Sequence, residues 1–569
     1  MMTRVKKVIN SIARFFRDVR VLAIWVPIAL IVPNVVLSLT EPVSVTSALA
    51  NVLLPLGVYL LMMASWKRTG VVTWLMLPFM IFAGFQIVLL YLYGGSVIAV
   101  DMFLNVVTTN VSEATELLAN LVEAMAVVII LYVPALIWGV IAICRKYFCK
   151  SPFQKKMSIA GGISAISGGG LALLSLIYVP DYSFIHETFP INAISNLAEA
   201  CHRYDETSRH DELADNFTYR AKSTHPENLR EAYLFVIGET ARGDNWQLGG
   251  YERPTNPLLA KEDGVVFFPK SVSESNTTHK SVPMLMSFAS AENFDSIAHY
   301  KSVITAFREA GFSTAFISNQ VPNRSFTEHF GNEADTVMYV YKMADGTHSY
   351  DDAVIAPVRK LLADTTRHKQ LIVVHTYGSH FKYYERYPAS FSAFKPDKAI
   401  DANVDNRQEL INAYDNSIRY TDFVLHSLIQ ELRQVDGPTA LVYASDHGED
   451  IFDDSRERFL HASPVPTYWQ IHQASLVWLS PRLVSNNPDM MTALKSNSTR
   501  RISPQKSLFP TVMQLAGITS PTVVDSLSLV SKNYNPAPVV YLNDLNDALP
   551  LDKCGLKPMD LDRLSPILK

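Results

Sequence analysis

The stretch AYLFVIGETAR, residues 232–242, decides the fold class of the second half of this chain. It opens with an unbroken apolar run that ends at Gly238 and continues with Glu239, Thr240 and Arg242. A short run that is apolar at every position is typical of a strand buried on both faces of a parallel sheet. Ligands bind beyond the carboxyl ends of such strands, so the polar residues after Gly238 are candidates for a functional site.

The same pattern recurs along the chain. Further apolar runs predict buried strands at 314–318, 371–375 and 440–445, and helical stretches at 300–310, 351–363 and 407–433 alternate with them. Alternating strands and helices predict an α/β domain with a mostly parallel central sheet. We expect this domain to cover residues 231–569.

Two carboxylates and an imidazole follow two of these strands. Glu239 comes after the first run, and Asp446 and His447 come after the run at 440–445. Carboxylate oxygens and an imidazole nitrogen form a plausible zinc site with one open position. A hydroxyl in that position would become acidic and act as a nucleophile.

Thr277 and Thr278 are the candidate nucleophiles, because they stand just ahead of a predicted helix with Pro283 in its early turns. A helix N-terminus offers free N–H groups to a phosphate. His380 and His461 could bind phosphoryl oxygens or protonate a leaving alcohol. Each signal alone is commonly structural, since a Thr pair before a helix is usually an N-cap. Only the combination favours phosphoryl chemistry.

The first 180 residues contain five apolar stretches that are long enough to cross a bilayer, at 21–40, 45–65, 71–94, 119–143 and 158–179. Lys and Arg gather in the N-terminal segment and in the loops around Lys67 and Lys150, whereas the loops at 41–44 and 95–118 have none. This distribution predicts a cytoplasmic N-terminus. Five crossings then place everything after residue 180 outside the cytoplasm.

Residues 181–230 are polar and form a predicted bridging segment. Apolar residues recur there at helical spacing: Phe189, Ile191, Ile194, Leu197 and Ala198. They predict a short amphipathic helix that lies on the membrane surface or packs on the soluble domain as an ordinary linker.

Net charge and cysteine positions bear on possible binding partners and on disulfide formation. The net charge of −4 is close to balanced and does not indicate nucleic-acid binding. Cys144 and Cys149 fall in a loop predicted to be cytoplasmic, so we expect free thiols. Cys201 and Cys554 fall in the exported part, where they could form one disulfide or stay unpaired.

Together, these motifs resemble the phosphoethanolamine transferases that modify lipid A and other lipopolysaccharide sugars. That family includes the mobile colistin-resistance enzymes and belongs to the alkaline phosphatase and sulfatase superfamily. The resemblance covers nearly the whole chain and rests on VIGETAR at 236–242, Thr278 with SVP at 281–283, His375 to His380 with YYERYP at 383–388, SDHGE at 445–449, and Leu460 with His461.

The resemblance implies a catalytic zinc held by Glu239, Thr278, Asp446 and His447. Thr278 would be the nucleophile and would carry a phosphoethanolamine ester between two half-reactions. His380 and His461 would line the phosphate site and could hold a second zinc. The implied donor is phosphatidylethanolamine, and the implied acceptor is lipid A or another surface glycan. We expect the protein to be a monomer in the lipid bilayer. Its product carries an added amine and therefore attracts cationic peptides such as polymyxin less strongly.

Two stretches depart from the family pattern. Members often have a Cys-Gly pair before the nucleophile, whereas Ser275-Asn276-Thr277 stands here. The choice between Thr277 and Thr278 therefore stays open, with the spacing to Ser281 favouring Thr278. The acidic stretch DIFDD, at 450–454, could meet a cationic ethanolamine group or be a solvated loop.

Other functions are compatible with the same residues. A phosphoglycerol transferase would use phosphatidylglycerol as donor, and a phosphate-ester hydrolase would admit water to the covalent intermediate. No Cys-x-Pro-x-Arg motif of the kind used by sulfatases follows the first strand. A membrane-tethered metal-binding sensor would keep the metal ligands but would not need Thr278.

Overall fold

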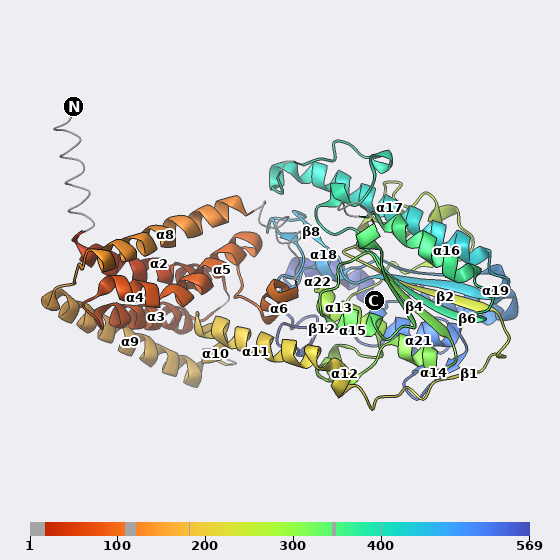
Figure 1. Ribbon diagram of the computed structural model, residues 1–569, viewed down its shortest axis with the longest axis horizontal. Coiled ribbons are helices and arrows are strands. Elements are labelled where there is room, and N and C mark those ends of the chain that lie inside the picture. Colours follow the sequence, from red (N-terminus) through yellow and green to blue (C-terminus); the bar gives the residue numbers. More distant parts are fainter. Residues whose placement is uncertain (1–16, 42, 109–120, 181, 344–348, 400) are drawn as a thin grey trace. The chain divides into compact units, whose positions relative to one another are not determined.

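The fold is described from a computed structural model, which covers residues 17–41, 43–108, 121–180, 182–343, 349–399 and 401–569 (Figure 1). The chain divides into two compact units. One consists of Met1–Phe103 and Leu117–Cys201, and the other of Leu104–Glu116 and His202–Lys569. The finer boundaries at residues 180 and 230 stay predictions.

The described part of the first unit is built from apolar helices. Its long elements are α2 (Val19–Thr40), α3 (Val45–Ala64), α4 (Thr69–Leu75), α5 (Leu77–Tyr93), α8 (Val122–Cys144) and α9 (Ser151–Tyr178). Four of them are single helices long and apolar enough to cross a membrane, and α4 with α5 forms a pair bent by 53° that can count as a fifth span. Pro78 lies in the first turn of α5, and a proline there favours a helix start over continuation of the preceding helix.

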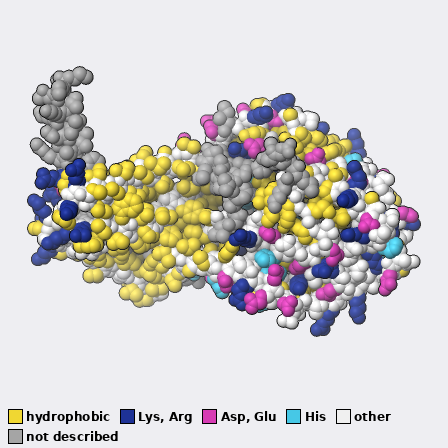
Figure 2. All heavy atoms as spheres, in the orientation of Figure 1, with side chains coloured by type: hydrophobic (Ala, Val, Ile, Leu, Met, Phe, Trp, Pro, Cys, Tyr) yellow, Lys and Arg dark blue, Asp and Glu magenta, His cyan; other side chains and the backbone are white. Residues whose placement is uncertain are grey.

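The outer surface of these helices is apolar. In Figure 2 hydrophobic side chains cover it, and Lys and Arg side chains gather at one end. Exposed residues such as Ile130, Ile166 and Ile177 are 64%, 79% and 70% accessible. In water such a surface would be unfavourable, so its composition fits a lipid environment.

Small residues allow α3 and α9 to pack closely. A Cβ atom built on Gly57 would lie 2.3 Å from the backbone nitrogen of Ala165, and one on Gly168 would lie 2.3 Å from that of Leu54. Only glycine permits backbones to approach this closely, as is common between membrane helices.

The bridging segment differs in detail from the prediction. Phe189 precedes the helix α11 (Ile191–Ser208) and is fully buried; its N–H donates to Asn51 and its carbonyl accepts from Asn34. Within α11, Ile194 and Leu197 are 46% and 38% exposed, so this apolar edge is not packed inside the unit. A role at the membrane surface stays a prediction.

The second unit is built on a seven-stranded sheet with the order β3–β10–β7–β2–β6–β4–β5. The strands are β2 (Glu231–Gly238), β3 (Val265–Phe267), β4 (Ser313–Ser318), β5 (Thr336–Tyr339), β6 (Lys369–His375), β7 (Thr439–Ser445) and β10 (Ser475–Leu479). The strands from β7 to β5 run parallel, whereas β10 is antiparallel to both β7 and β3. The four predicted strands are confirmed as β2, β4, β6 and β7.

Helices cover both faces of this sheet (Figure 1). Tyr233, Phe235 and Ile237 face a core shared with α13 (Thr278–Met286), α14 (Val303–Glu309) and α21 (Pro504–Leu515). Leu234 and Val236 face a second core, shared with α16 (Ile355–Ala363) and α17 (Arg407–Arg433). Burial on both faces explains why β2 is apolar throughout, and the predicted mostly parallel α/β domain is confirmed.

All four cysteines are free: Cys144 and Cys201 are exposed, and Cys149 and Cys554 are buried. Rigidity of the second unit therefore comes from its two apolar cores and buried polar contacts, without a disulfide in the described residues.

We predict that Gly57→Ala destabilises the first unit by about 1–3 kcal/mol, because the new methyl group must push α3 away from α9. Gly162→Ala is the matched control, since a Cβ atom there meets nothing within 4 Å. Thermal unfolding of the purified protein in detergent measures both variants. Equal melting temperatures for the two would contradict the close packing of these helices.

Candidate active site

Two strand ends bring the predicted carboxylates together. β2 and β7 pair in parallel with Gly238 opposite Ser445, so Glu239 and Asp446 leave the sheet side by side. Asp446 Oδ1 accepts hydrogen bonds from the N–H of Thr240 at 3.0 Å and from that of His447 at 2.8 Å. Glu239, Asp446 and His447 are all buried.

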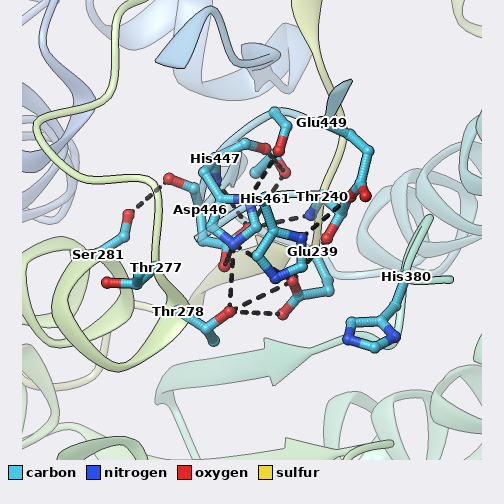
Figure 3. A network of polar contacts seen from close by, with 12 residues as sticks. Glu239, Thr240, Thr277, Thr278, Ser281, His380, Asp446, His447, Glu449 and His461 are labelled. Atoms are coloured by element: carbon cyan, nitrogen blue, oxygen red, sulfur yellow. Dashed lines mark hydrogen bonds and ion pairs between the residues drawn. The ribbon is translucent and has the colours of Figure 1, made fainter. Parts of the chain in front are cut away.

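Thr278 is the first residue of α13, and its hydroxyl points into this cluster (Figure 3). Its Oγ1 lies 3.3 and 3.4 Å from the two carboxylate oxygens of Glu239 and 3.3 Å from Nε2 of His447. Thr277 occupies the N-cap position, but its Oγ1 lies 3.1 Å from Oγ of Ser275 and makes no capping hydrogen bond. The structure thus brings Thr278, and not Thr277, to the cluster.

His461 joins the cluster from the turn after β9 (Phe459–Leu460). Its ring centroid lies 4.2 Å from that of His447. Ligand atoms of Glu239, His447 and His461 all lie within 4.8 Å of one another, as a metal-binding group requires. The sequence predicted His461 at the phosphate site and as a possible ligand of a second zinc, and this geometry groups it with Glu239 and His447 as a candidate ligand of one ion.

His380 lies outside the hydrogen-bonded cluster (Figure 3), with its ring centroid 5.9 Å from that of His461. Its loop is anchored to the first strand, because the N–H of Ser379 donates to the carbonyl of Glu239 at 2.9 Å. Gly378 permits this approach: its φ is +57°, and a Cβ atom there would lie 2.5 Å from that carbonyl oxygen.

The available donor atoms fit a zinc ion. Asp446 Oδ2 is buried and lies 3.1 Å from Nε2 of His447. Nδ1 of His447 can donate to the Gly448 carbonyl at 2.8 Å, and Nδ1 of His461 to Glu449 at 3.1 Å. Each bond leaves an Nε2 lone pair for a metal, the arrangement common for zinc-binding histidines.

Burial and mutual charge shift the pKa values of these groups. Burial, and then the charge of Asp446, raise the pKa of Glu239 to about 8. Burial would raise the pKa of Asp446, but the charge of His447 and its hydrogen bond outweigh burial and lower it to about 2. Burial lowers the pKa of His380 to about 3, with a further contribution from His461. A cluster that retains protons to offset its carboxylates is one in which a divalent cation can replace them.

Further polar groups position Asp446 and Glu239 through hydrogen bonds. The hydroxyl groups of Ser273 and Ser281 both donate to the carbonyl of Asp446, and Gln505 donates to both hydroxyl groups. Gln320, after β4, donates to Glu239 at 3.1 Å. Sequence reasoning did not assign roles to Gln320, Gln505 or Glu449. A position just after a strand could have indicated Gln320, whereas nothing local marks Gln505.

The acidic stretch 450–454 is engaged inside the protein. Asp453, whose side chain is 2% exposed, pairs with Arg242 at 2.7 Å and with Arg407 at 3.3 Å. Asp450 is buried and accepts a hydrogen bond from Thr467 at 2.9 Å. These two carboxylates are therefore not part of a solvated loop, and arginine already neutralises the charge of Asp453.

A pocket of about 140 Å³ opens onto the cluster. Glu239, Thr278, His380 and His461 contribute to its lining. The candidate nucleophile, the candidate metal ligand Glu239 and both predicted phosphate-site histidines thus share one cavity.

Comparison with known proteins gives a family for this arrangement. A family model described as Sulfatase matches residues 231–518, which hold all the site residues named above. The chain belongs to the sulfatase family. Among its relatives is the "Kdo(2)-lipid A phosphoethanolamine 7''-transferase" of Escherichia coli strain K12. The two sequences are 30% identical over 385 residues, which make up 65% of this chain and 64% of that relative. The chain therefore matches slightly less than two thirds of that relative's length.

Solved structures agree with this family. The C-terminal periplasmic domain of EcEptC from Escherichia coli, solved in complex with Zn, is 26% identical with a TM-score of 0.53, over 58% of this chain and 95% of that domain. The integral membrane protein lipooligosaccharide phosphoethanolamine transferase A (EptA) from Neisseria meningitidis shares the fold, with a TM-score of 0.69 and 22% identity over 89% of this chain and 97% of that one. The predicted resemblance and the predicted fold class are confirmed.

We predict that Glu449→Gln weakens zinc affinity by roughly 10- to 100-fold, because the amide no longer orients His461 as the carboxylate does. Chelator competition on the purified protein measures the affinity. Glu457→Gln, an exposed position in the same segment, serves as the control and should bind zinc like the unmodified chain. Unchanged affinity in Glu449→Gln would exclude His461 from the metal site.

Proposed function

We propose that this protein transfers phosphoethanolamine from phosphatidylethanolamine to lipid A or another surface glycan in a zinc-dependent reaction. One observation carries the proposal: the Thr278 hydroxyl lies between Glu239 and His447 at the start of a helix, inside a pocket. The relatives named as phosphoethanolamine transferases favour this reaction over other group transfers.

Thr278 is the proposed nucleophile and Glu239, Asp446 and His447 the proposed metal ligands, with His461 as a further candidate. When bound, zinc would lower the pKa of the Thr278 hydroxyl and offset negative charge on the phosphoryl oxygens. The start of α13 adds backbone N–H groups and the positive end of a helix dipole beside the same phosphoryl group.

The reaction balances in two half-reactions. First, Thr278 Oγ1 forms a bond to phosphorus while the bond from phosphorus to the glycerol oxygen breaks, and the proton lost by threonine ends on the diacylglycerol hydroxyl. Second, an oxygen of the acceptor attacks the phosphothreonine, and Thr278 regains a proton. Both steps are in-line displacements at phosphorus, so no oxidant or external co-reactant is needed.

The contacts of His380 suggest how it acts. Its Nδ1 lies 2.7 Å from the carbonyl of Phe381 and can donate to it, which leaves an Nε2 lone pair. A neutral imidazole in this tautomer accepts protons. We therefore propose that His380 takes the proton of the acceptor hydroxyl in the second half-reaction, in which Thr278 regains a proton.

The apolar helices give this chemistry its setting. We propose an inner-membrane anchor at residues 1–180, a bridge at 181–230 and a periplasmic catalytic domain at 231–569, acting as a monomer. Donor and acceptor are both lipids, so an anchored enzyme meets them in one plane. The added amine lowers the negative charge of the cell surface and so its attraction for polymyxin-like cations.

Mass spectrometry of glycolipids tests the reaction. In cells that produce the unmodified protein, we expect lipid A or another glycan to gain one phosphoethanolamine unit. Thr278→Ala should abolish this gain, whereas Thr277→Ala should retain most of it, because the Thr277 hydroxyl bonds to Ser275 instead of the cluster.

Other results would redirect the proposal. Loss of transfer only in Thr277→Ala would move the nucleophile. Free phosphoethanolamine without a modified glycan would indicate a hydrolase, and transfer from phosphatidylglycerol alone a phosphoglycerol transferase. A zinc-loaded protein without any transfer would favour the metal-binding sensor.

A further inference from the structure

The pocket that contains Thr278 has a second polar wall. Glu328, Tyr339 and His375 line it, together with Phe316 and Gln320. Gln320 is already engaged, because its amide donates to Glu239 and to the carbonyl of Thr376. The other three polar groups, Glu328, Tyr339 and His375, take no part in the chemistry proposed for Thr278 and its neighbours.

Two of these groups are buried without satisfied hydrogen bonds. The Tyr339 hydroxyl and Nε2 of His375 have no hydrogen-bond partner among the described residues. His375 is only 3% exposed, and its Nδ1 lies 3.4 Å from the hydroxyl of Ser318. Burying polar atoms without partners is unfavourable, so both atoms are available to a ligand in the pocket.

Glu328 brings a negative charge to the same wall. One carboxylate oxygen accepts the N–H of Arg324 at 2.7 Å, but no ion pair joins Glu328 to a Lys, Arg or His side chain in the described part of the chain. Burial, and then the charge of Glu328, raise the pKa of Tyr339 to about 12. The carboxylate therefore lies close enough to the phenol to influence its pKa.

Packing gathers these groups around one aromatic ring. α15 (Phe326–Gly331) lies directly on Phe316, since a Cβ atom on Gly331 would come within 2.5 Å of that ring. Glu328 is three residues before Gly331 and so lies on the same side of the helix. The Phe316 ring centroid is 6.3 Å from that of Tyr339 and 6.4 Å from that of His375.

We infer that Glu328, Tyr339 and His375 form a subsite that recognises a primary ammonium group. Such a group has three N–H donors and one positive charge, and this wall offers a carboxylate, a phenol oxygen and an imidazole lone pair. A neutral chain could not satisfy these acceptors, and a quaternary ammonium lacks the donors. In the proposed reaction, on which this inference rests, the subsite would hold the ethanolamine end of the donor.

The test compares two donors with the full-length protein. One is phosphatidylethanolamine, and the other is an isostere with an uncharged propyl group in place of the aminoethyl group. The unmodified protein should release diacylglycerol from phosphatidylethanolamine with the higher kcat/KM. Glu328→Gln should lower kcat/KM for phosphatidylethanolamine about tenfold through a higher KM and leave that of the isostere unchanged, because only the ammonium loses a charged partner. Glu227→Gln removes an exposed carboxylate elsewhere and should match the unmodified protein.

A binding measurement separates recognition from turnover. In the Thr278→Ala background, which cannot react, we expect a short-chain phosphatidylethanolamine to bind more weakly after Glu328→Gln, with no change for the isostere. Tyr339→Phe removes one acceptor while keeping the ring, so it should reduce the preference for phosphatidylethanolamine over the isostere. This variant provides the test if Glu328→Gln fails to fold.

The possible outcomes distinguish failure of the ammonium subsite from failure of the transferase proposal. If the unmodified protein releases diacylglycerol from phosphatidylethanolamine but shows no preference over the isostere, the ammonium subsite is wrong and the transferase proposal stands. The same holds if the folded variants keep the full preference. If zinc-loaded, unmodified protein does not cleave phosphatidylethanolamine at all, the transferase proposal fails and the inference fails with it.

Discussion

The parallel pairing of β2 with β7 is the constraint on which the candidate site depends. It sets Gly238 opposite Ser445, so the chain leaves the sheet twice at the same edge and delivers Glu239 beside Asp446 and His447. The two loops then bond to each other, because Asp446 accepts the N–H of Thr240. A slip of the register would separate these side chains and also turn apolar side chains of β2 away from their cores.

The carboxylates gathered at this edge of the sheet must be stabilised by the groups around them. Two buried carboxylates repel each other, and removing them from water costs free energy unless a cation or hydrogen bonds compensate. Here hydrogen bonds satisfy Asp446 Oδ1, whereas Oδ2 is left beside the Nε2 atom of His447. A divalent cation bound between these atoms would resolve the repulsion, which is the physical reason to regard the cluster as a metal site.

Two kinds of functional group line the same pocket. Near the ends of β2 and β7 lie groups suited to phosphoryl transfer. Near the ends of β4 and β5 lie Glu328 and Tyr339, which suit a cationic group. Adjacent parallel strands place their carboxyl ends along one edge, so a single sheet can present both sets of residues to one small substrate.

The sequence by itself determined the types of residue at the strand ends and the positions of the buried strands. An apolar run followed at once by polar residues is a local pattern, and β2, β4, β6 and β7 therefore matched their predictions within two residues. Long apolar stretches gave the membrane helices in the same way. The sequence did not predict the bend between α4 and α5, because proline in the first turn of a helix is also common without a bend.

Only the tertiary structure decided which distant residues meet. It brought Thr278 rather than its neighbour to Glu239, grouped His461 with Glu239 and His447, and paired Asp453 with Arg242. It also set Glu328, Tyr339 and His375 around Phe316. Each of these outcomes depends on the packing of segments far apart in the chain. Local sequence patterns report the burial and conformation of one segment, but not its distance from another.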